Sequence, residues 1–253
     1  MLPNKKYIYK INIAIARFSI IVSIFFVIWF SIFWAKNKNT FNKQTIIING
    51  ASVLSVTNYI EYIKSSIDSD STNLESNFIL ECLYKHPYIA AARLSYRYPN
   101  KIIIDISERS PFAILNKDPM IMFDQDSFVL PNIENIEDYS IPILSKYNIA
   151  PELHPLGKQS LSVKIKETIS WLKKLNKKYP DLYNSISEVT LDDGDEIILI
   201  LAEHPTKIML GNTNTLHKIE ILKRFEKTLE QKKEITDYAY LDMRYNNQII
   251  VKE

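Results

Sequence analysis

Cysteine and glycine are scarce in this 253-residue chain. Cys82 is the only cysteine, so the chain cannot form an intrachain disulfide, and its stability must come from packing. Only four glycines occur, and none belongs to a glycine-rich phosphate loop or a dinucleotide-binding fingerprint. The metalloprotease pattern HExxH, the hydrolase pattern GxSxG and the redox pattern CxxC are also absent from the sequence. We therefore expect no cofactor, no metal and no enzymatic activity.

Charge of one sign is also lacking, because 31 lysines and arginines are balanced by 29 acidic residues, which gives a net charge of +2. The basic residues are spread among acidic ones, and no field of lysine or arginine indicates a nucleic-acid site. The pairs Lys173-Lys174 and Lys177-Lys178 fall in a predicted amphipathic helix, where we interpret them as its solvated face. The sequence predicts neither a nucleic acid nor a small-molecule substrate as a partner.

One long hydrophobic run stands near the amino terminus. Residues 18–35 carry no charge, and their only polar side chains are three serines. As a helix, these eighteen residues measure about 27 Å, close to the thickness of the hydrocarbon core of a bilayer. A cleaved signal peptide is the alternative, but the run does not end in the small residues of a cleavage site. We predict a single transmembrane helix over residues 18–35 that anchors the protein in the lipid bilayer.

The charges that flank this run favour one orientation. Three lysines and Arg17 precede it together with the amino terminus, and three lysines follow it. The small excess predicts a cytoplasmic tail at residues 1–17, a linker at residues 36–44 and an extracytoplasmic remainder. We therefore expect a single-pass protein of the cytoplasmic (inner) membrane.

After the linker, the pattern of side chains predicts a strand, two helices and two strands. Residues 45–48 form a β-branched run that ends at Asn49-Gly50, a turn-forming pair. Two stretches of helical spacing and two alternating runs follow, at residues 56–67, 74–86, 92–98 and 102–106. The two alternating runs indicate a hairpin with one buried face. We assign residues 45–109 to one domain.

Residues 110–253 are predicted to form a second, β-rich domain with two helices. Helical spacing marks residues 161–175 and 216–229. Hairpins are expected at Asp193-Gly194 and at Asn246-Asn247, because such pairs tolerate the positive φ of a two-residue turn. The expected strands cover residues 186–191, 196–201, 206–210, 238–245 and 248–251. The predicted fold class is therefore α+β, with a transmembrane helix before two mixed domains.

Isolated acidic and histidine side chains give no catalytic pattern. Three histidines directly precede a proline, which is typical of an element boundary: His86, His154 and His204. We interpret the acidic runs at residues 124–126 and 192–196 as solvated turns, because neither has the spacing of an EF-hand calcium loop. Glu108-Arg109 is interpreted as a structural pair at the joint between the domains, since glycoside hydrolysis normally needs two carboxylates.

The segment from His86 to Pro111 reads HPYIAAARLSYRYPNKIIIDISERSP and resembles the POTRA domain of the FtsQ/DivIB family of bacterial cell-division proteins. Further stretches extend the resemblance: MFDQDSFVL at 122–130, IPIL at 141–144, IMLG at 208–211, Lys218, and LDMRY at 241–245. The resemblance runs from the hydrophobic segment nearly to Glu253. It implies a β-α-α-β-β POTRA domain over residues 45–109 and an FtsQ-type β domain over residues 110–253.

The resemblance also implies a non-enzymatic scaffold at the division septum that links early and late division proteins. In this family the C-terminal part of the β domain docks the small partners FtsB and FtsL, and an exposed edge strand permits strand addition. The residues implied on this edge are Arg244, Tyr245, Gln248, Ile249 and Val251. For Ile249 and Val251, burial against the helix around Phe225 is an equal alternative, because one face of such a strand must be covered.

Arg93, Leu94 and Tyr96 on the predicted POTRA hairpin are candidates for contact with an upstream recruiter, or else ordinary sheet residues. Two rival functions remain open. A membrane-anchored POTRA chaperone would hand unfolded polypeptides to a transporter. An enzyme acting on the cell wall would require a deep cleft with perturbed carboxylates.

Overall fold

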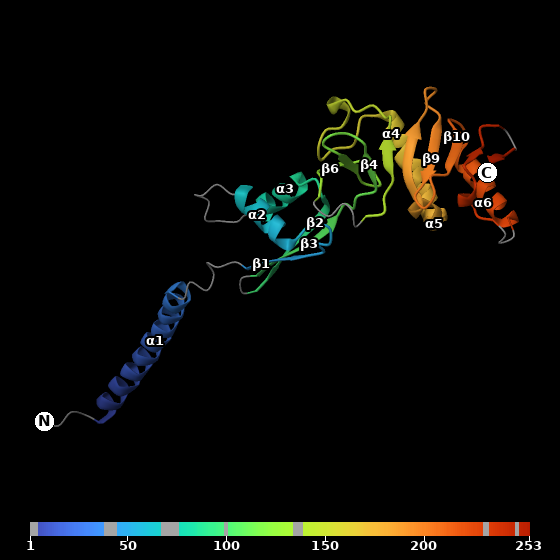
Figure 1. The fold of residues 1–253 in the computed structure, drawn as a ribbon. Helices are drawn as coiled ribbons and strands as arrows, with labels where there is room; N and C mark the ends of the chain where they lie inside the picture. The colour runs from blue at the N-terminus through green and yellow to red at the C-terminus, as the bar shows by residue number, and fades with distance from the viewer. Residues whose placement is uncertain are drawn as a thin grey trace. The chain divides into compact units, whose positions relative to one another are not determined.

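A computed structural model of the chain describes residues 5–37, 45–66, 76–98, 101–133, 139–229, 233–245 and 248–253 (Figure 1). It is a mixed α+β structure with one N-terminal apolar helix and a large β-sheet. By its internal contacts the chain divides into two compact units. The first unit comprises residues 1–49 and 93–105, and the second unit comprises residues 50–92 and 106–253.

Helix α1 spans Lys5–Asn37 and contains the stretch Arg17–Trp34. Among the described helices, this is the one long and apolar enough to cross a membrane. Helix α1 is longer than the predicted span, because no proline or glycine interrupts residues 5–37. It therefore begins within the predicted tail and ends within the predicted linker, and linker residues 38–44 lie outside the described residues.

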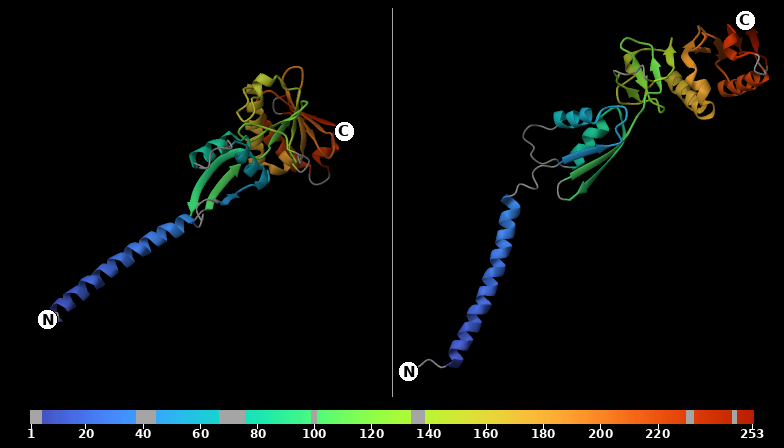
Figure 2. Two further views of the ribbon diagram at one scale, coloured as in Figure 1. Left: turned by 90° about the vertical axis from the view of Figure 1, so that its left-hand side faces the viewer. Right: turned by 60° about the horizontal axis from the view of Figure 1, so that its bottom comes forward.

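Three strands form a small sheet in the order β1-β3-β2 (Figures 1 and 2). Their bounds are Thr45–Asn49 for β1, Ile89–Arg97 for β2 and Lys101–Glu108 for β3. Strands β1 and β3 are parallel, with Thr45 opposite Lys101 and Asn49 opposite Asp105. Alternation along these isoleucine-rich strands buries one set of side chains, Ile48, Ile102 and Ile104. The predicted turn residues Pro99 and Asn100 lie outside the described residues.

Two helices lie between β1 and β2 in the sequence, as predicted: α2 (Val56–Ser66) and α3 (Ser76–Lys85). Each is amphipathic and buries the apolar side chains that recur at helical spacing. Those fully buried are Tyr59 and Ile63 on α2 and Ile79 and Leu83 on α3. Along the chain, the element order is therefore strand, helix, helix, strand, strand.

The remaining strands form a nine-stranded sheet in the order β12-β11-β10-β9-β8-β7-β4-β5-β6. Short strands make up its first half: β4 (Ala113–Leu115), β5 (Ile121–Phe123), β6 (Val129–Leu130) and β7 (Ile143–Ser145). The second half contains β8 (Ile186–Leu191), β9 (Ile197–Leu201), β10 (Lys207–Gly211), β11 (Tyr240–Asp242) and β12 (Ile250–Lys252). The hairpin predicted at Asp193-Gly194 is confirmed as the antiparallel pair β8 and β9.

Three α-helices accompany this sheet, whereas the sequence predicted two: α4 (Val163–Lys178), the short α5 (Pro180–Asn184) and α6 (Thr215–Thr228). The described residues also include the 3₁₀ turns η2 (Pro151–Leu153) and η3 (Ile235–Asp237). The prediction that the helical stretch begins at Leu161 is wrong, since α4 begins at Val163 and Leu161 is 60% exposed. The Ser162 side chain caps the helix by accepting a hydrogen bond from the Ile165 N–H, so the helix starts after Leu161.

Among the described residues, the strands of the nine-stranded sheet contribute apolar side chains to a main and a smaller hydrophobic core. Helices α4 and α6 share the main core with strand residues that include Leu115, Phe123 and Leu241. A smaller core contains Ile114 and Met122, the neighbours of such residues along β4 and β5. Successive side chains of a strand point to opposite faces, so these strands are buried on both faces.

Glu108 and Arg109 do not bond each other, so their interpretation as a pair is wrong. The Glu108 carboxylate accepts hydrogen bonds from the Ser52, Val53 and Leu54 N–H groups, and from the Ser52 and Tyr59 hydroxyls. Burial alone would raise the pKa of Glu108, but these donors, led by the Tyr59 hydroxyl, lower it below its usual value. The carboxylate fastens the segment before α2 to the end of β3.

Arg109 has its own partner, Asp124, at 2.7 Å between Nη1 and Oδ2. Its guanidinium carbon also lies 3.6 Å from the centroid of the Phe128 ring. Both charged side chains are largely buried, at 15% and 6% exposure. A planar guanidinium serves both contacts at once, which a lysine at this position cannot reproduce.

Replacing Glu108 should destabilise the fold. We expect Glu108→Ala to lower the free energy of unfolding by about 2 kcal/mol, because several partly buried donors lose their acceptor. Exposed Glu61 on α2 provides the matched control, because Glu61→Ala should change the free energy of unfolding little. Denaturant titration of the full chain in detergent measures both, and equal values for the two variants would contradict the structural role of Glu108.

The same carboxylate should make stability depend on pH. Because the pKa of Glu108 is lower in the folded chain than in the unfolded one, the carboxylate stabilises the fold above its ordinary titration range. That stabilisation is lost as the pH falls through the folded pKa. When the pH falls from neutral to acidic, the free energy of unfolding should therefore decrease less for the Glu108→Gln variant than for the unchanged protein. If the free energy of unfolding changes with pH in the same way for both proteins, this expectation is refuted.

Candidate partner-binding edge

Strand β12 lies at one end of the nine-stranded sheet and has β11 as its neighbour. The two strands pair antiparallel, with Leu241 opposite Val251. No strand pairs with the other side of β12 in the part of the chain that the structure describes, and its residues are exposed. The predicted edge position is confirmed, but the strand begins at Ile250 instead of Gln248. The predicted turn at Asn246-Asn247 lies outside the described residues.

The opposite end of the sheet, at β6, is covered by the chain itself. The Val129 N–H donates to the Lys158 carbonyl, and the Gly157 N–H donates to the Val129 carbonyl, both at 2.9 Å. The Ser160 N–H adds a third bond, to the Ser127 carbonyl at 2.8 Å. A segment that bonds an edge strand in this way prevents another chain from pairing with it. Among the described residues, β12 is thus the end of this sheet that no other segment covers.

The predicted edge residues differ in how far they are exposed. Tyr245 and Val251 are exposed, at 56% and 38%, and Gln248 is exposed as well. Ile249 is partly buried and packs against the main core. The sequence left burial and partner contact equally open for Ile249 and Val251, and the structure buries Ile249 in part and leaves Val251 exposed. It also adds exposed Ile250, which lies within the predicted strand but was not among the residues implied on this edge.

The Arg244 side chain is 38% exposed, and its guanidinium bonds two carboxylates of the same chain. Its Nε and Nη2 donate to the two carboxylate oxygens of Asp242, at 2.9 and 2.7 Å, and its Nη1 donates to Glu196 at 3.2 Å. The Asp242 side chain is only 9% exposed. Hydrogen bonding by Arg244 lowers the pKa of Asp242 below its usual value, against the opposing effect of burial. Arg244 therefore fixes the chain that leads from β11 towards β12.

Lys218 and Gly211 complete this cluster. Lys218 is buried, and its Nζ donates to the Leu210 carbonyl at 2.6 Å. Gly211 has a φ of +73°, and a Cβ there would lie 3.4 Å from that Nζ. Two charged residues within the otherwise apolar stretch LDMRY were the available sign of this ionic cluster. The sequence reasoning used Asp242 and Arg244 only as motif residues, and it missed the bonds that Arg244 makes to Asp242 and Glu196.

Arg93, Leu94 and Tyr96 lie on β2, at one edge of the three-stranded sheet. Arg93 and Tyr96 are exposed, and Leu94 is half-buried. Successive side chains of a strand alternate, so Leu94 and Tyr96 share one face and Arg93 lies on the other. The three residues therefore do not form one continuous patch on a single face.

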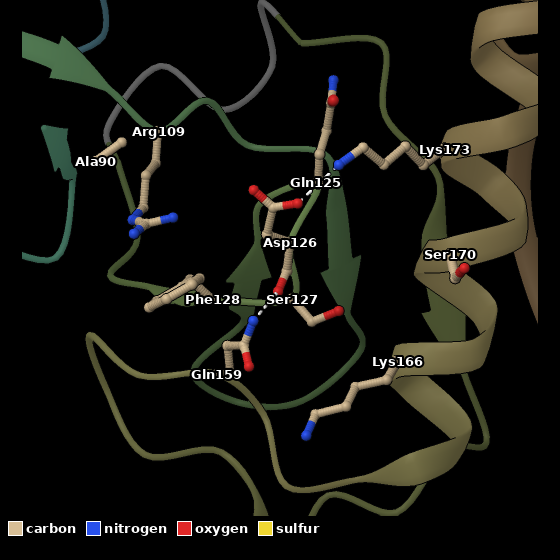
Figure 3. A pocket seen from close by; sticks show the side chains of 10 residues that line it. All are labelled: Ala90, Arg109, Gln125, Asp126, Ser127, Phe128, Gln159, Lys166, Ser170 and Lys173. Carbon is tan, nitrogen blue, oxygen red and sulfur yellow. Dashed lines mark hydrogen bonds and ion pairs between the residues drawn. The ribbon is translucent and has the colours of Figure 1, made fainter.

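A polar hollow of about 590 Å³ lies beside α4 (Figure 3). Lys173 forms an ion pair with Asp126 at 2.7 Å, and the Gln159 amide donates to the Asp126 carbonyl at 3.1 Å (Figure 3). Asp126 is the only carboxylate among the residues that line the hollow. Acid–base hydrolysis of a glycoside normally uses two carboxylates that face each other, and this hollow does not supply such a pair.

The acidic turns bind their own backbone. Asp192 accepts hydrogen bonds from the N–H groups of Glu196 and Gly194, which lower its pKa, in the exposed turn that was predicted. Asp124 differs, because it is only 4% exposed and also accepts from the Asp126 and Phe128 N–H groups. The interpretation of Asp124 as part of a solvated turn is therefore wrong. Within the described ranges, no cluster of three or more His, Cys, Asp or Glu side chains can hold a metal.

The three histidines before prolines differ in burial. His154 is buried, and its ring bonds the Ser160 hydroxyl and the Asn148 carbonyl. His86 follows the end of α3 and contacts the rings of Tyr59 and Tyr62. Burial lowers the pKa of His86, against the opposing charge of Glu108. These contacts give the two side chains structural roles.

Truncating Arg244 should affect stability as well as any partner contact. We expect Arg244→Ala to cost about 2 kcal/mol, because it leaves buried Asp242 without its main partner while solvent partly screens the guanidinium. Arg244→Lys should recover only part of this loss, since an ammonium cannot bond both carboxylate oxygens in the same planar geometry. Exposed Arg224 on α6 offers the control Arg224→Ala. Thermal unfolding compares the variants, and an unaffected Arg244→Ala protein would contradict the role of the cluster.

The family model described as "FtsQ/DivIB, C-terminal related" matches residues 119–252, a little over half of the chain. Three proteins named "Cell division protein FtsQ" are similar to it. Identity is 26% over 168 residues for Syntrophotalea carbinolica, 24% over 176 for Geotalea daltonii and 22% over 171 for Anaeromyxobacter sp.. The alignments cover 66%, 68% and 68% of this chain. They cover 58%, 62% and 57% of the relatives, so the chain spans about three fifths of their length. The family match includes β12, Arg244 and Lys218, and the chain belongs to the FtsQ/DivIB family.

Proposed function

We propose that this protein is a membrane-anchored, non-enzymatic scaffold of the bacterial division machinery. It would link early and late division proteins at the septum and bind FtsB/FtsL-like partners. Family membership and the names of the relatives support a role in cell division. The apolar stretch of α1 supports attachment to a membrane.

The domain boundaries and the orientation belong to the same proposal. We assign residues 45–109 to a POTRA domain and residues 110–253 to the FtsQ-type β domain, and the strand-helix-helix-strand-strand order supports the first assignment. The excess of positive charge before the span favours a cytoplasmic amino terminus, with the bulk of the chain outside the cytoplasm.

The open side of β12 carries the proposed mechanism. Backbone N–H and C=O groups along an edge strand can pair with an extended partner segment, and alternate side chains then set specificity. The covered edge at β6 leaves β12 as the end of the sheet where such a segment can add. Exposed Tyr245, Gln248, Ile250 and Val251 would contact the added strand or its side chains. Arg244 and Ile249 would position the edge from within the fold.

Arg93, Leu94 and Tyr96 remain our candidates for recruitment by an upstream protein. Their place on the edge strand β2 is compatible with contact by a partner. The alternative function, a POTRA chaperone for polypeptide transport, is less favoured than division because of the family match. A fluorescent fusion separates the two: septal enrichment supports division, and a uniform envelope signal supports transport.

Proline substitutions at neighbouring positions test strand addition. Successive N–H groups of a strand point to opposite sides, so Ile250→Pro and Val251→Pro remove donors from opposite sides of β12. We expect one variant to weaken the pairing with β11 and the other to weaken partner binding, by about tenfold for one lost hydrogen bond.

The alanine variants Ile250→Ala and Val251→Ala are the matched controls, because they shorten the same side chains and keep the N–H groups. Titration of the full chain with an FtsB-like partner gives affinity, and thermal unfolding gives stability. Strand addition is excluded if both proline variants bind as tightly as their alanine counterparts.

A further inference from the structure

Positive charge is concentrated in the first unit, although the whole chain is nearly neutral. This unit, residues 1–49 and 93–105, contains ten lysines and arginines and one acidic residue, Asp105. The chain totals of 31 basic and 29 acidic residues leave 21 basic and 28 acidic residues for the second unit. The expectation that charges are evenly mixed is therefore wrong at the level of the units. The first unit also contains the apolar stretch of α1.

The strand register brings the tip of the β2–β3 hairpin to the end of the sheet nearest α1 along the chain. Thr45, the first residue of β1, lies opposite Lys101, the first residue of the parallel strand β3. Strand β2 ends at Arg97, and β3, its neighbour in the sheet, begins at Lys101. Arg97, Tyr98 and Lys101 therefore lie at the end of the sheet where β1 begins.

The side chains at this end combine aromatic rings with positive charge. Tyr98 is 87% exposed and Tyr96 is 59% exposed, and Arg97 and Lys101 are exposed as well. No acidic residue occurs between Ile89 and Ile104. Tyrosines with lysines and arginines are typical of protein surfaces that meet lipid headgroups, because the rings suit the interface and the cations suit anionic lipids.

The chain length limits how far this end can lie from the membrane. Eight Cα–Cα steps join Asn37, the last residue of α1, to Thr45. At full extension such a segment reaches about 29 Å. A contact made within the reach of so short a tether is effectively intramolecular, so even a weak affinity for lipid can keep it populated.

We propose that the tip of the β2–β3 hairpin, through Arg97, Tyr98 and Lys101, rests on the anionic headgroup surface of the bilayer that α1 anchors. This inference rests on the membrane attachment in the proposed function. It gives the hairpin tip a lipid surface as its partner, while Arg93 and Leu94 lie further from the tip along β2. The contact would restrict how the three-stranded sheet is held above the membrane.

Depth-sensitive quenching in vesicles tests the contact on the full chain. A single cysteine is placed at Tyr98→Cys or, as the control near the other end of β2, at Ala91→Cys, with buried Cys82 replaced by alanine. Each protein carries a fluorophore on the cysteine and is reconstituted into phosphatidylcholine vesicles with or without phosphatidylglycerol. The quencher is a lipid with a spin-labelled headgroup. We expect stronger quenching at residue 98 than at residue 91, and a larger difference with phosphatidylglycerol.

Charge reversal supplies the second comparison. Arg97→Glu with Lys101→Glu should reduce quenching at residue 98 to the value at residue 91. Lys174→Glu with Lys177→Glu, a matched reversal on the exposed face of α4, should leave it unchanged. Equal quenching at residues 98 and 91, in vesicles that carry the protein, overturns the lipid contact but not the membrane anchor. The exposed hairpin tip would then be a candidate surface for a protein partner. Failure of the protein to float with the vesicles contradicts the anchor as well.

Discussion

A strand at the edge of a β-sheet leaves backbone donors and acceptors unpaired along one side, and the proposed function of this chain depends on where that side lies. Residues 157–160 bond the β6 end of the nine-stranded sheet, and β12 ends the other side. A partner strand can pair with β12 only if β12 is held in place, and β12 is a short strand with one strand neighbour. The bonds of Arg244 to Asp242 and Glu196, together with buried Lys218, hold the neighbouring segment in place.

Local patterns in the sequence predicted most elements of the fold. Isoleucine-rich alternation indicated β1 and β3, helical spacing indicated α2, α4 and α6, and Asp193-Gly194 marked the β8–β9 hairpin. The short helix α5 and the exposure of Leu161 were missed, because a helix start is set by capping geometry that apolar spacing does not encode. The edge position of the last strand was predicted, and its start was placed two residues too early.

The charged contacts could not be predicted in the same way. Glu108 bonds residues about fifty positions earlier in the chain, and Arg244 reaches Glu196 across 48 positions. Such pairs depend on the three-dimensional course of the chain, so neighbouring charges in the sequence suggested the wrong pair, Glu108 with Arg109. Average composition similarly concealed the separation of charge between the two units. Fold class and the candidate edge thus followed from the sequence, whereas the supporting contacts required the structure.

Hydrogen–deuterium exchange on the full chain in lipid nanodiscs tests strand addition at the backbone atoms concerned. Amide exchange would be compared with and without a bound FtsB-like partner. The account predicts slower exchange on binding at Ile250–Lys252, where an added strand would accept bonds from the open side, and no comparable change at Val129–Leu130. Partner binding that leaves the β12 amides as exposed as before, with protection confined to other parts of the chain, would contradict it.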